Sequence, residues 1–139
     1  DKLKGLRLTA MSAKGACMVC LDLSGAQLQG ANLQNADLRM ANLTKADLRG
    51  ARLTGANLTK ADLRQAFLSP LPLGPTRQTQ SNLQGARVRY ALVQAADLSE
   101  AVFDGADLRG SDFTGARVAK ASFRQVDLSQ VQGLDFSLP

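Results

Sequence analysis

The chain has 139 residues, of which 45% are hydrophobic but only 4% aromatic, and its formal net charge is +5. This length suffices for one domain with a buried core, which must be built mainly from aliphatic side chains. The longest unbroken apolar stretch, residues 16–21, is far shorter than the roughly 20 residues of a transmembrane helix, which excludes a helical membrane span.

Residues 1–15 are predicted to cap the N-terminal end of the domain. They keep only a faint trace, at Leu3 and Leu8, of the apolar period that governs the rest of the chain. A stack of repeats needs such a cap, with a short helix as one solution, because an open end offers unpaired backbone groups to other strands.

Cys17 and Cys20 form a C-x-x-C pair where the expected cap meets the first repeats. A zinc site needs four ligands, and the chain has two Cys and no His, so a metal site would require a second copy. A redox-active pair would want a helix N-terminus to lower the thiol pKa. A structural pair, either free or as a disulfide, is the favoured reading, followed by a redox pair and then a metal site.

Residues 16–68 repeat every five positions. A large apolar residue recurs at Leu23, Leu28, Leu33, Leu38, Leu43, Leu48, Leu53, Leu58, Leu63 and Leu68, and a small residue, usually Ala, stands two positions before each. On an α-helix a period of five would turn the apolar position by about 140° each time, and on a flat strand it would alternate faces. A chain that turns a corner every five residues keeps both residues pointing inward. Glycine two positions after the Leu supplies the positive φ of a type II turn.

Units such as "ANLTK", "ADLRG" and "ADLSE" resemble the A-(D/N)-L-x-x signature of the pentapeptide repeat proteins. The resemblance covers residues 16 to about 130 and implies an all-β fold, a right-handed quadrilateral β-helix with about 20 residues per coil. At the usual strand spacing, six or seven coils would form a rod roughly 30 Å long. The opening "CMVCLDLSGA" resembles those of cyanobacterial, and so bacterial, members of the family.

Residues 69–80, "SPLPLGPTRQTQ", interrupt the repeats with three of the four prolines, which cannot donate to a backbone ladder. Two layouts remain open. The segment either replaces two repeats in place, with Leu71 and Leu73 pointing inward, or about ten residues loop out. Gln78 at a core position favours the loop.

Residues 81–130 resume the repeat, and residues 131–139 end it. Residues twenty apart should then be stacked, and four such pairs carry opposite charges: Arg87 with Asp107, Asp97 with Arg117, Glu100 with Lys120, and Asp104 with Arg124. The final segment has no clear cap, so it either folds over the last coil or a second copy covers that end. The resemblance implies a homodimer through the C-terminal end as one arrangement.

No enzyme is expected, and no cofactor or metal, because the chain has no His and its regularly spaced Asp residues support turns rather than form a catalytic pair. The favoured function is a scaffold that binds an unidentified protein partner. The departures from polar outward positions predict a contact patch of Phe67, Leu71, Leu73, Arg77, Tyr90 and Leu92.

Some relatives act on DNA gyrase by imitating DNA, which is the alternative function. A mimic of this length would need a charge of order −20, and the net charge of +5 disfavours it. Direct nucleic-acid binding is also disfavoured, because the Lys and Arg residues of the first half are spread over all four sides. The compartment stays open between the cytoplasm and, if a leader has been removed, the periplasm or thylakoid lumen.

Overall fold

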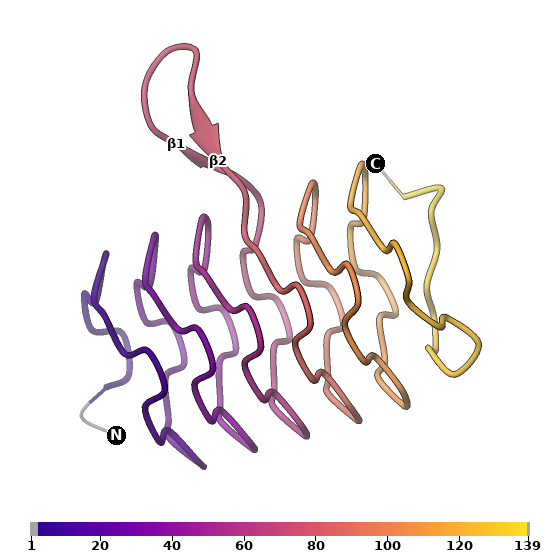
Figure 1. Ribbon diagram of the computed structural model, residues 1–139, viewed down its shortest axis with the longest axis horizontal. Helices are drawn as coiled ribbons and strands as arrows, with labels where there is room; N and C mark the ends of the chain where they lie inside the picture. The colour runs from indigo at the N-terminus through magenta and orange to yellow at the C-terminus, as the bar shows by residue number, and fades with distance from the viewer. Residues whose placement is uncertain (1–2, 139) are drawn as a thin grey trace.

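A computed structural model describes residues 3–138 and shows a rod of stacked coils (Figure 1). Isolated parallel bridges link residues 20 apart in the first half, for example Arg7 with Gln27 and Asp47 with Phe67. Because successive bridges start every five residues, each coil has four sides. Within the described residues the named strands are β1 (Leu71–Pro72) and β2 (Gln78–Thr79). The same residues contain no helix long and apolar enough to cross a bilayer.

The inside of the rod is filled by two residues from each side. The central Leu, Val or Phe and the Ala two positions earlier are buried along the stack, with Leu28, Ala31 and Leu33 fully excluded from solvent. Each buried Leu contributes about 1.5–3 kcal/mol through the removal of its apolar surface from water. The aliphatic column along the axis is therefore the main source of stability.

Nearly every corner is a β-turn whose third residue has positive φ, with Gln130 near the C-terminal end as an exception. At one corner the Ala31 amide donates to the Leu28 carbonyl at 3.0 Å, and Gly30 has a φ of 67°. Lys60 adopts the same conformation with a φ of 60°, which costs an L-residue roughly 1–2 kcal/mol. The Asp or Asn before the central residue supports the turn. Asn42 Oδ1, for example, accepts hydrogen bonds from the amide and hydroxyl of Thr44 at 3.0 and 2.7 Å.

The Pro-rich segment leaves the coil as a hairpin. The bridges that span it link residues 30 apart, including Arg52 with Asn82 and Phe67 with Asp97, so ten residues are extruded and the stacking continues unchanged. This is the second of the two layouts expected from the sequence. Strands β1 and β2 pair antiparallel, Leu71 opposite Thr79, and the hairpin projects from one corner of the rod (Figure 1).

A buried serine closes the coil where the hairpin departs. Ser81 takes an inward position that is normally Ala and is fully buried. Its hydroxyl donates to the Leu48 carbonyl at 2.9 Å and accepts from the Gly50 amide at 3.1 Å. At an uninterrupted corner the next coil's backbone would accept from such an amide, as Arg49 does from Gly30. The hydroxyl thus replaces a backbone partner that the hairpin removes.

The expectation that residues 1–15 form a cap is corrected by the structure. The Gly5 amide donates to the Ser24 carbonyl at 2.9 Å, and Arg7 bridges Gln27, so residues 5–15 form sides and corners of the first coil without a helix. The inward residues Ala13 and Met18 are buried. The period was faint because Leu6 and Met11 stand where other repeats have Ala, and Ala13 and Met18 stand where they have Leu. Residues 1 and 2 lie outside the described part.

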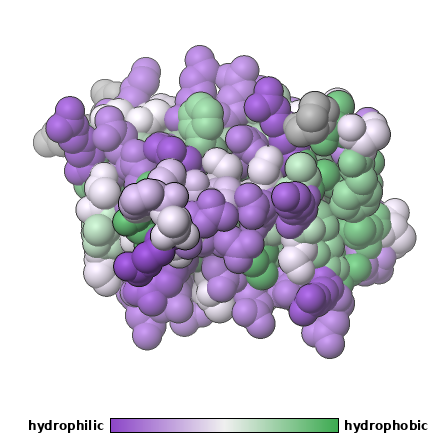
Figure 2. Space-filling view, turned by 90° about the horizontal axis from the view of Figure 1, so that it is seen from above, coloured by the Kyte–Doolittle hydropathy of each residue, from purple (hydrophilic) through white to green (hydrophobic). Residues whose placement is uncertain are grey.

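The C-terminal segment folds back on the last coil without covering it fully. Phe103 and Phe123 stack with their ring centroids 5.2 Å apart, and Phe136 meets Phe123 edge to face at 5.8 Å. Phe136 nevertheless remains 61% exposed. Apolar side chains gather at this end of the rod, at the right of Figure 2.

Replacement of Ser81 by Ala should lower the free energy of unfolding by about 1–3 kcal/mol, because the Gly50 amide loses its buried acceptor. Ser111→Ala is the matched control. Ser111 is also fully buried, but its hydroxyl donates only to the Leu108 carbonyl, which also accepts the Ser111 amide. Urea unfolding of both variants provides the measurement, and equal losses would contradict the role assigned to Ser81.

Candidate functional site

Outward-facing residues stack in columns, one residue per coil, and two neighbouring columns each contain one large apolar residue that is exposed. One column runs through Arg7, Gln27, Asp47, Phe67, Asp97 and Arg117, and its neighbour through Asp22, Asn42, Asp62, Leu92, Asp112 and Gln132. Phe67 is 47% exposed and Leu92 is 39% exposed. These two residues are the clearest departures from an otherwise polar pair of sides.

Phe67 and Leu92 lie on adjacent sides that meet at the corner formed by Gln65 and Ala95. The Gln65 amide donates to the Gln94 carbonyl at 3.0 Å, which stacks the two corner residues. A hollow of about 480 Å³ beside Phe67 and a second of about 350 Å³ beside Gln94 share both corner residues. We call these two hollows the corner groove. Phe67 lines the larger hollow, and Leu92 lies on the adjacent side of the corner, outside both linings.

The hairpin rests on a different corner. A Cβ built on Gly50 would lie 2.7 Å from Thr79 Cγ2 and 2.8 Å from Leu71 Cβ, so only glycine allows this close approach. The Gln80 side chain donates to the Glu100 carbonyl at 3.0 Å. Leu71 is consequently partly buried, whereas Leu73 is 50% exposed and Arg77 is also exposed.

The predicted contact residues do not form one patch. Tyr90 is 55% exposed, and its ring lies over Gly110, where a Cβ would overlap the ring carbons. Tyr90 stacks above the corner of Lys60, half a coil away from the Gly50 corner that carries the hairpin. Tyr90 and the hairpin are close in sequence but far apart on the rod, because the chain runs along two sides between their corners. Phe67 and Leu92 lie on the two sides that meet at the Gln65 corner, whereas Leu71, Leu73 and Arg77 belong to the hairpin at the Gly50 corner.

The four oppositely charged pairs are stacked as expected, but none of them forms a close ion pair within the described residues. Arg87 and Asp107, and Asp97 and Arg117, are bridged through their backbones, but the close ion pairs form mainly within one repeat. Those pairs are Arg39–Asp37 at 2.8 Å, Arg49–Asp47 at 2.9 Å, Arg64–Asp62 at 2.6 Å and Arg109–Asp107 at 3.0 Å. One pair, Arg89–Asp107, does join neighbouring coils.

The reason lies in the turn. The Asp before the central residue already accepts the amide of the residue two positions on, so an Arg there reaches the same carboxylate. Hydrogen bonds from the Arg39 guanidinium hold the pKa of Asp37 below its usual value. These exposed pairs contribute little to stability. Lys45 and Arg117, which line the corner groove, take part in no close ion pair within residues 3–138.

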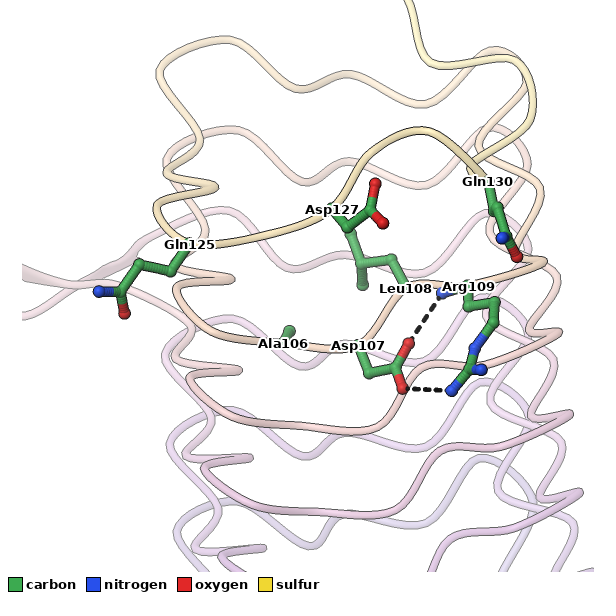
Figure 3. A pocket seen from close by; sticks show the side chains of 7 residues that line it. All are labelled: Ala106, Asp107, Leu108, Arg109, Gln125, Asp127 and Gln130. Atoms are coloured by element: carbon green, nitrogen blue, oxygen red, sulfur yellow. Dashed lines mark hydrogen bonds and ion pairs between the residues drawn. The ribbon is translucent and has the colours of Figure 1, made fainter.

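Another hollow, of about 350 Å³, opens where the last coil diverges from the stack (Figure 3). Asp127 should bridge Asp107, as Asp107 bridges Arg87, but no such bridge forms within the described residues. Asp107 is held by Arg89 and Arg109 at 2.6 and 3.0 Å. Hydrogen bonds from Ser129 lower the pKa of Asp127, and the charge of Asp107 opposes that shift. The two carboxylates, Asp107 and Asp127, therefore repel each other where the last coil diverges from the stack.

Cys17 and Cys20 are both exposed and free. Cys17 is on a side, bridged to Asp37, and Cys20 is at the next corner with a φ of 62°. The pair therefore belongs to a regular coil and not to the junction with a cap. Within residues 3–138 no cluster of three or more His, Cys, Asp or Glu residues is arranged to hold a metal ion.

The comparisons with known proteins agree with this architecture. The family model described as pentapeptide repeats matches in eight copies, over residues 8–44, 22–59, 31–69 and 94–130. These segments cover well over half of the chain, so the chain belongs to the pentapeptide repeat family. None of the curated proteins compared with it matches.

Similar solved structures include cyanobacterial members. The pentapeptide repeat protein alr5209 from Nostoc PCC 7120 is 36% identical, with 80% of this chain and 83% of that one covered and a TM-score of 0.62. HetL from Nostoc sp. strain PCC 7120, involved in heterocyst differentiation regulation, is 27% identical over 98% of this chain, with a TM-score of 0.45. The chain spans 63% of the length of HetL. QnrB1, a plasmid-mediated fluoroquinolone resistance protein, is 16% identical over 91% of this chain and 79% of its own, with a TM-score of 0.46.

Gly50→Ala should lift the hairpin from its corner, because the new Cβ collides with Leu71 and Thr79. Gly85→Ala is the matched control, since Gly85 has nearly the same φ, 67° against 69°, but nothing within 4 Å of the added atom. Trypsin cleavage after Arg77, followed by mass spectrometry, should be faster in Gly50→Ala than in the control. Equal rates would mean that the hairpin is not docked on Gly50.

Acid should weaken the turns that Asp residues support. Hydrogen bonds from the Ser24 hydroxyl and amide lower the pKa of Asp22 below its usual 3.8. Because the pKa is lower in the folded state, ionised Asp22 stabilises the protein above about pH 4. This stabilisation is lost as the pH falls through the folded-state pKa. Asp22→Asn keeps the acceptor, as Asn42 shows one coil on. The variant should therefore match wild type at pH 6 in urea unfolding and lose less stability at pH 2.5. An unchanged loss would contradict the assignment.

Proposed function

We propose that this protein is a non-enzymatic scaffold for protein–protein interaction. The observation that carries the proposal is the contrast between a mostly polar surface and a few exposed apolar residues: Phe67 and Leu92 on the sides, Met40 and Tyr90 at a corner, and Leu73 on the hairpin. Exposed apolar side chains on a rigid polar surface are typical of partner contacts. Family membership supports the same function, since repeat solenoids commonly offer extended binding surfaces.

The projecting hairpin is the first proposed contact. Its base is docked on Gly50 and tied to Glu100, while Leu73 and Arg77 are held away from the rod in solvent. A short, anchored hairpin loses little conformational entropy on binding, which favours affinity. Leu73 and Arg77 would then supply an apolar and a charged contact to the partner.

The finer features of the coil are also proposed from the family resemblance. We propose that it has the right-handed, quadrilateral form with about 20 residues per turn, and that the partly exposed C-terminal end pairs with a second copy. The exposed Phe136 and the partly buried Phe123 support an apolar contact there. Sedimentation of wild type and Phe136→Gln would test the homodimer. If it forms, the sedimentation coefficient should rise with protein concentration in wild type but not in the variant.

Interaction with DNA gyrase or another topoisomerase, by imitation of DNA, is the second candidate. The extruded loop favours this candidate, whereas the net charge of +5 argues against DNA mimicry. Strong inhibition of gyrase supercoiling by the purified protein would favour this candidate over the general scaffold. We further propose a bacterial source, with the compartment left between the cytoplasm and an exported location.

Partner capture from cells of the source organism should depend on the hairpin. Wild type and Leu73→Gln/Arg77→Gln would be compared by affinity purification and quantitative mass spectrometry. We expect at least one protein to be recovered by wild type and depleted about tenfold or more in the variant. Arg87→Asn, on a side that does not border the Gly50 corner, serves as the control and should retain the partner. Identical recovery by all three proteins would remove the hairpin from the binding surface.

A further inference from the structure

We propose that the corner groove binds an acidic peptide segment that carries one bulky apolar side chain. This inference deepens the scaffold function and rests on it, but it assigns a second binding surface separate from the hairpin. Phe67 and Leu92 are each the single apolar member of a polar column, and the fold places them on the two sides of one corner. A hollow of about 480 Å³ lies directly beside Phe67.

Small corner residues make room for the apolar anchor. The corner column contains Ala95 and Gly115 where other corners carry Tyr90 or Lys120, and both residues line the hollow beside Phe67. With the half-exposed Phe67 ring as one wall, the hollow can take a Leu or Phe side chain from a partner. Burial of such a side chain in a shaped cavity is the usual source of binding energy in short peptide contacts.

Charge at the groove selects an acidic partner. Lys45 and Arg117 line the larger hollow and Arg64 the smaller one, against Asp97 as the one acid in either lining. Arg64 is occupied by Asp62, whereas Lys45 and Arg117 form no close ion pair within the described residues. Two available cations flank the apolar wall, so Asp or Glu residues beside the anchor would find partners on both sides.

The Gln94 side chain offers a buried acceptor that a peptide N–H could satisfy. Its Nε2 donates to Asp112 Oδ2 at 3.0 Å, which fixes the amide orientation, and its Oε1 is buried without a hydrogen-bond donor. An unsatisfied buried acceptor is costly. A peptide can bring an N–H to this hollow after a small shift of the side chain, whereas phosphates carry no donor.

Selection from a random 12-residue peptide library displayed on phage tests the proposal. The immobilised full chain would be the target, and enriched peptides would be synthesised and titrated by fluorescence polarisation. We expect them to carry net negative charge around a Leu, Phe or other bulky apolar residue. Enrichment of neutral or basic peptides, or no enrichment, would overturn the proposal, as would tighter binding of a 12-nucleotide oligothymidine at the same residues.

Variants that copy neighbouring coils locate the site without disturbing the fold. Phe67→Gln reproduces Gln27 and Leu92→Asn reproduces Asn42, each within its own column. The double variant should bind the selected peptides at least tenfold more weakly, while Leu73→Gln on the hairpin should bind as wild type does. Unfolding in urea would confirm that both variants are folded, and equal binding by the double variant would place the peptides elsewhere.

The charge component has its own control. Lys45→Gln/Arg117→Gln should weaken binding several-fold and flatten its dependence on salt, since screening acts on the lost ion pairs. Arg52→Asn/Arg87→Asn removes two charges from the other two sides and should leave binding unchanged. Equal effects of the two double variants would mean that net charge, and not the groove, attracts the peptide. If the hairpin variant still loses its cellular partner while no acidic peptide binds here, the scaffold function stands and this inference fails.

Discussion

The structure depends on one constraint, which is that the chain must reverse direction by a quarter turn after every short side. Nearly every corner forces a residue into the left-handed region of φ, and each side must then hydrogen-bond to the coils before and after it. A single side has only one bridged residue and no stability of its own. The backbone ladder and the aliphatic column therefore form together or not at all, which is typical of solenoids, where each unit relies on its neighbours.

This constraint explains why the sequence is so repetitive. Alanine is needed beside each Leu because the interior of a four-sided coil has no room for two large side chains per side. Asp or Asn precedes the Leu because its carboxyl or amide oxygen caps the turn, as Asn42 does for Thr44. The repeated letters thus meet needs of the backbone and core, and information about partners is confined to outward positions that the constraint leaves free.

Much of the fold followed from the sequence because the five-residue period leaves few alternatives. The inward residues and the Gly corners were all evident from spacing, and Gln78 correctly favoured a loop over two replaced sides. The N-terminal coil was missed because Met11 replaces an inward Ala and Ala13 replaces the central Leu, although both Ala13 and Met18 are buried as the period requires. The site was harder to predict. Phe67 and Leu92 are 25 positions apart, and their meeting at one corner depends on how many residues the hairpin removes from the coil. The role of Ser81 could not be predicted from the sequence. Its hydroxyl accepts the Gly50 amide, which lacks a backbone acceptor only because the hairpin interrupts the coil.

The hairpin leaves and re-enters the rod at the same corner, and the stack on either side of it is unchanged in register. Its length is therefore independent of the five-residue period, since no residue between Leu68 and Ser81 takes part in the bridges that stack the coils. Loop closure costs rise only slowly with length, so segments of quite different size can be accommodated there. The protein therefore has an insertion site where evolution or engineering can introduce new recognition sequences without changing the coils on either side.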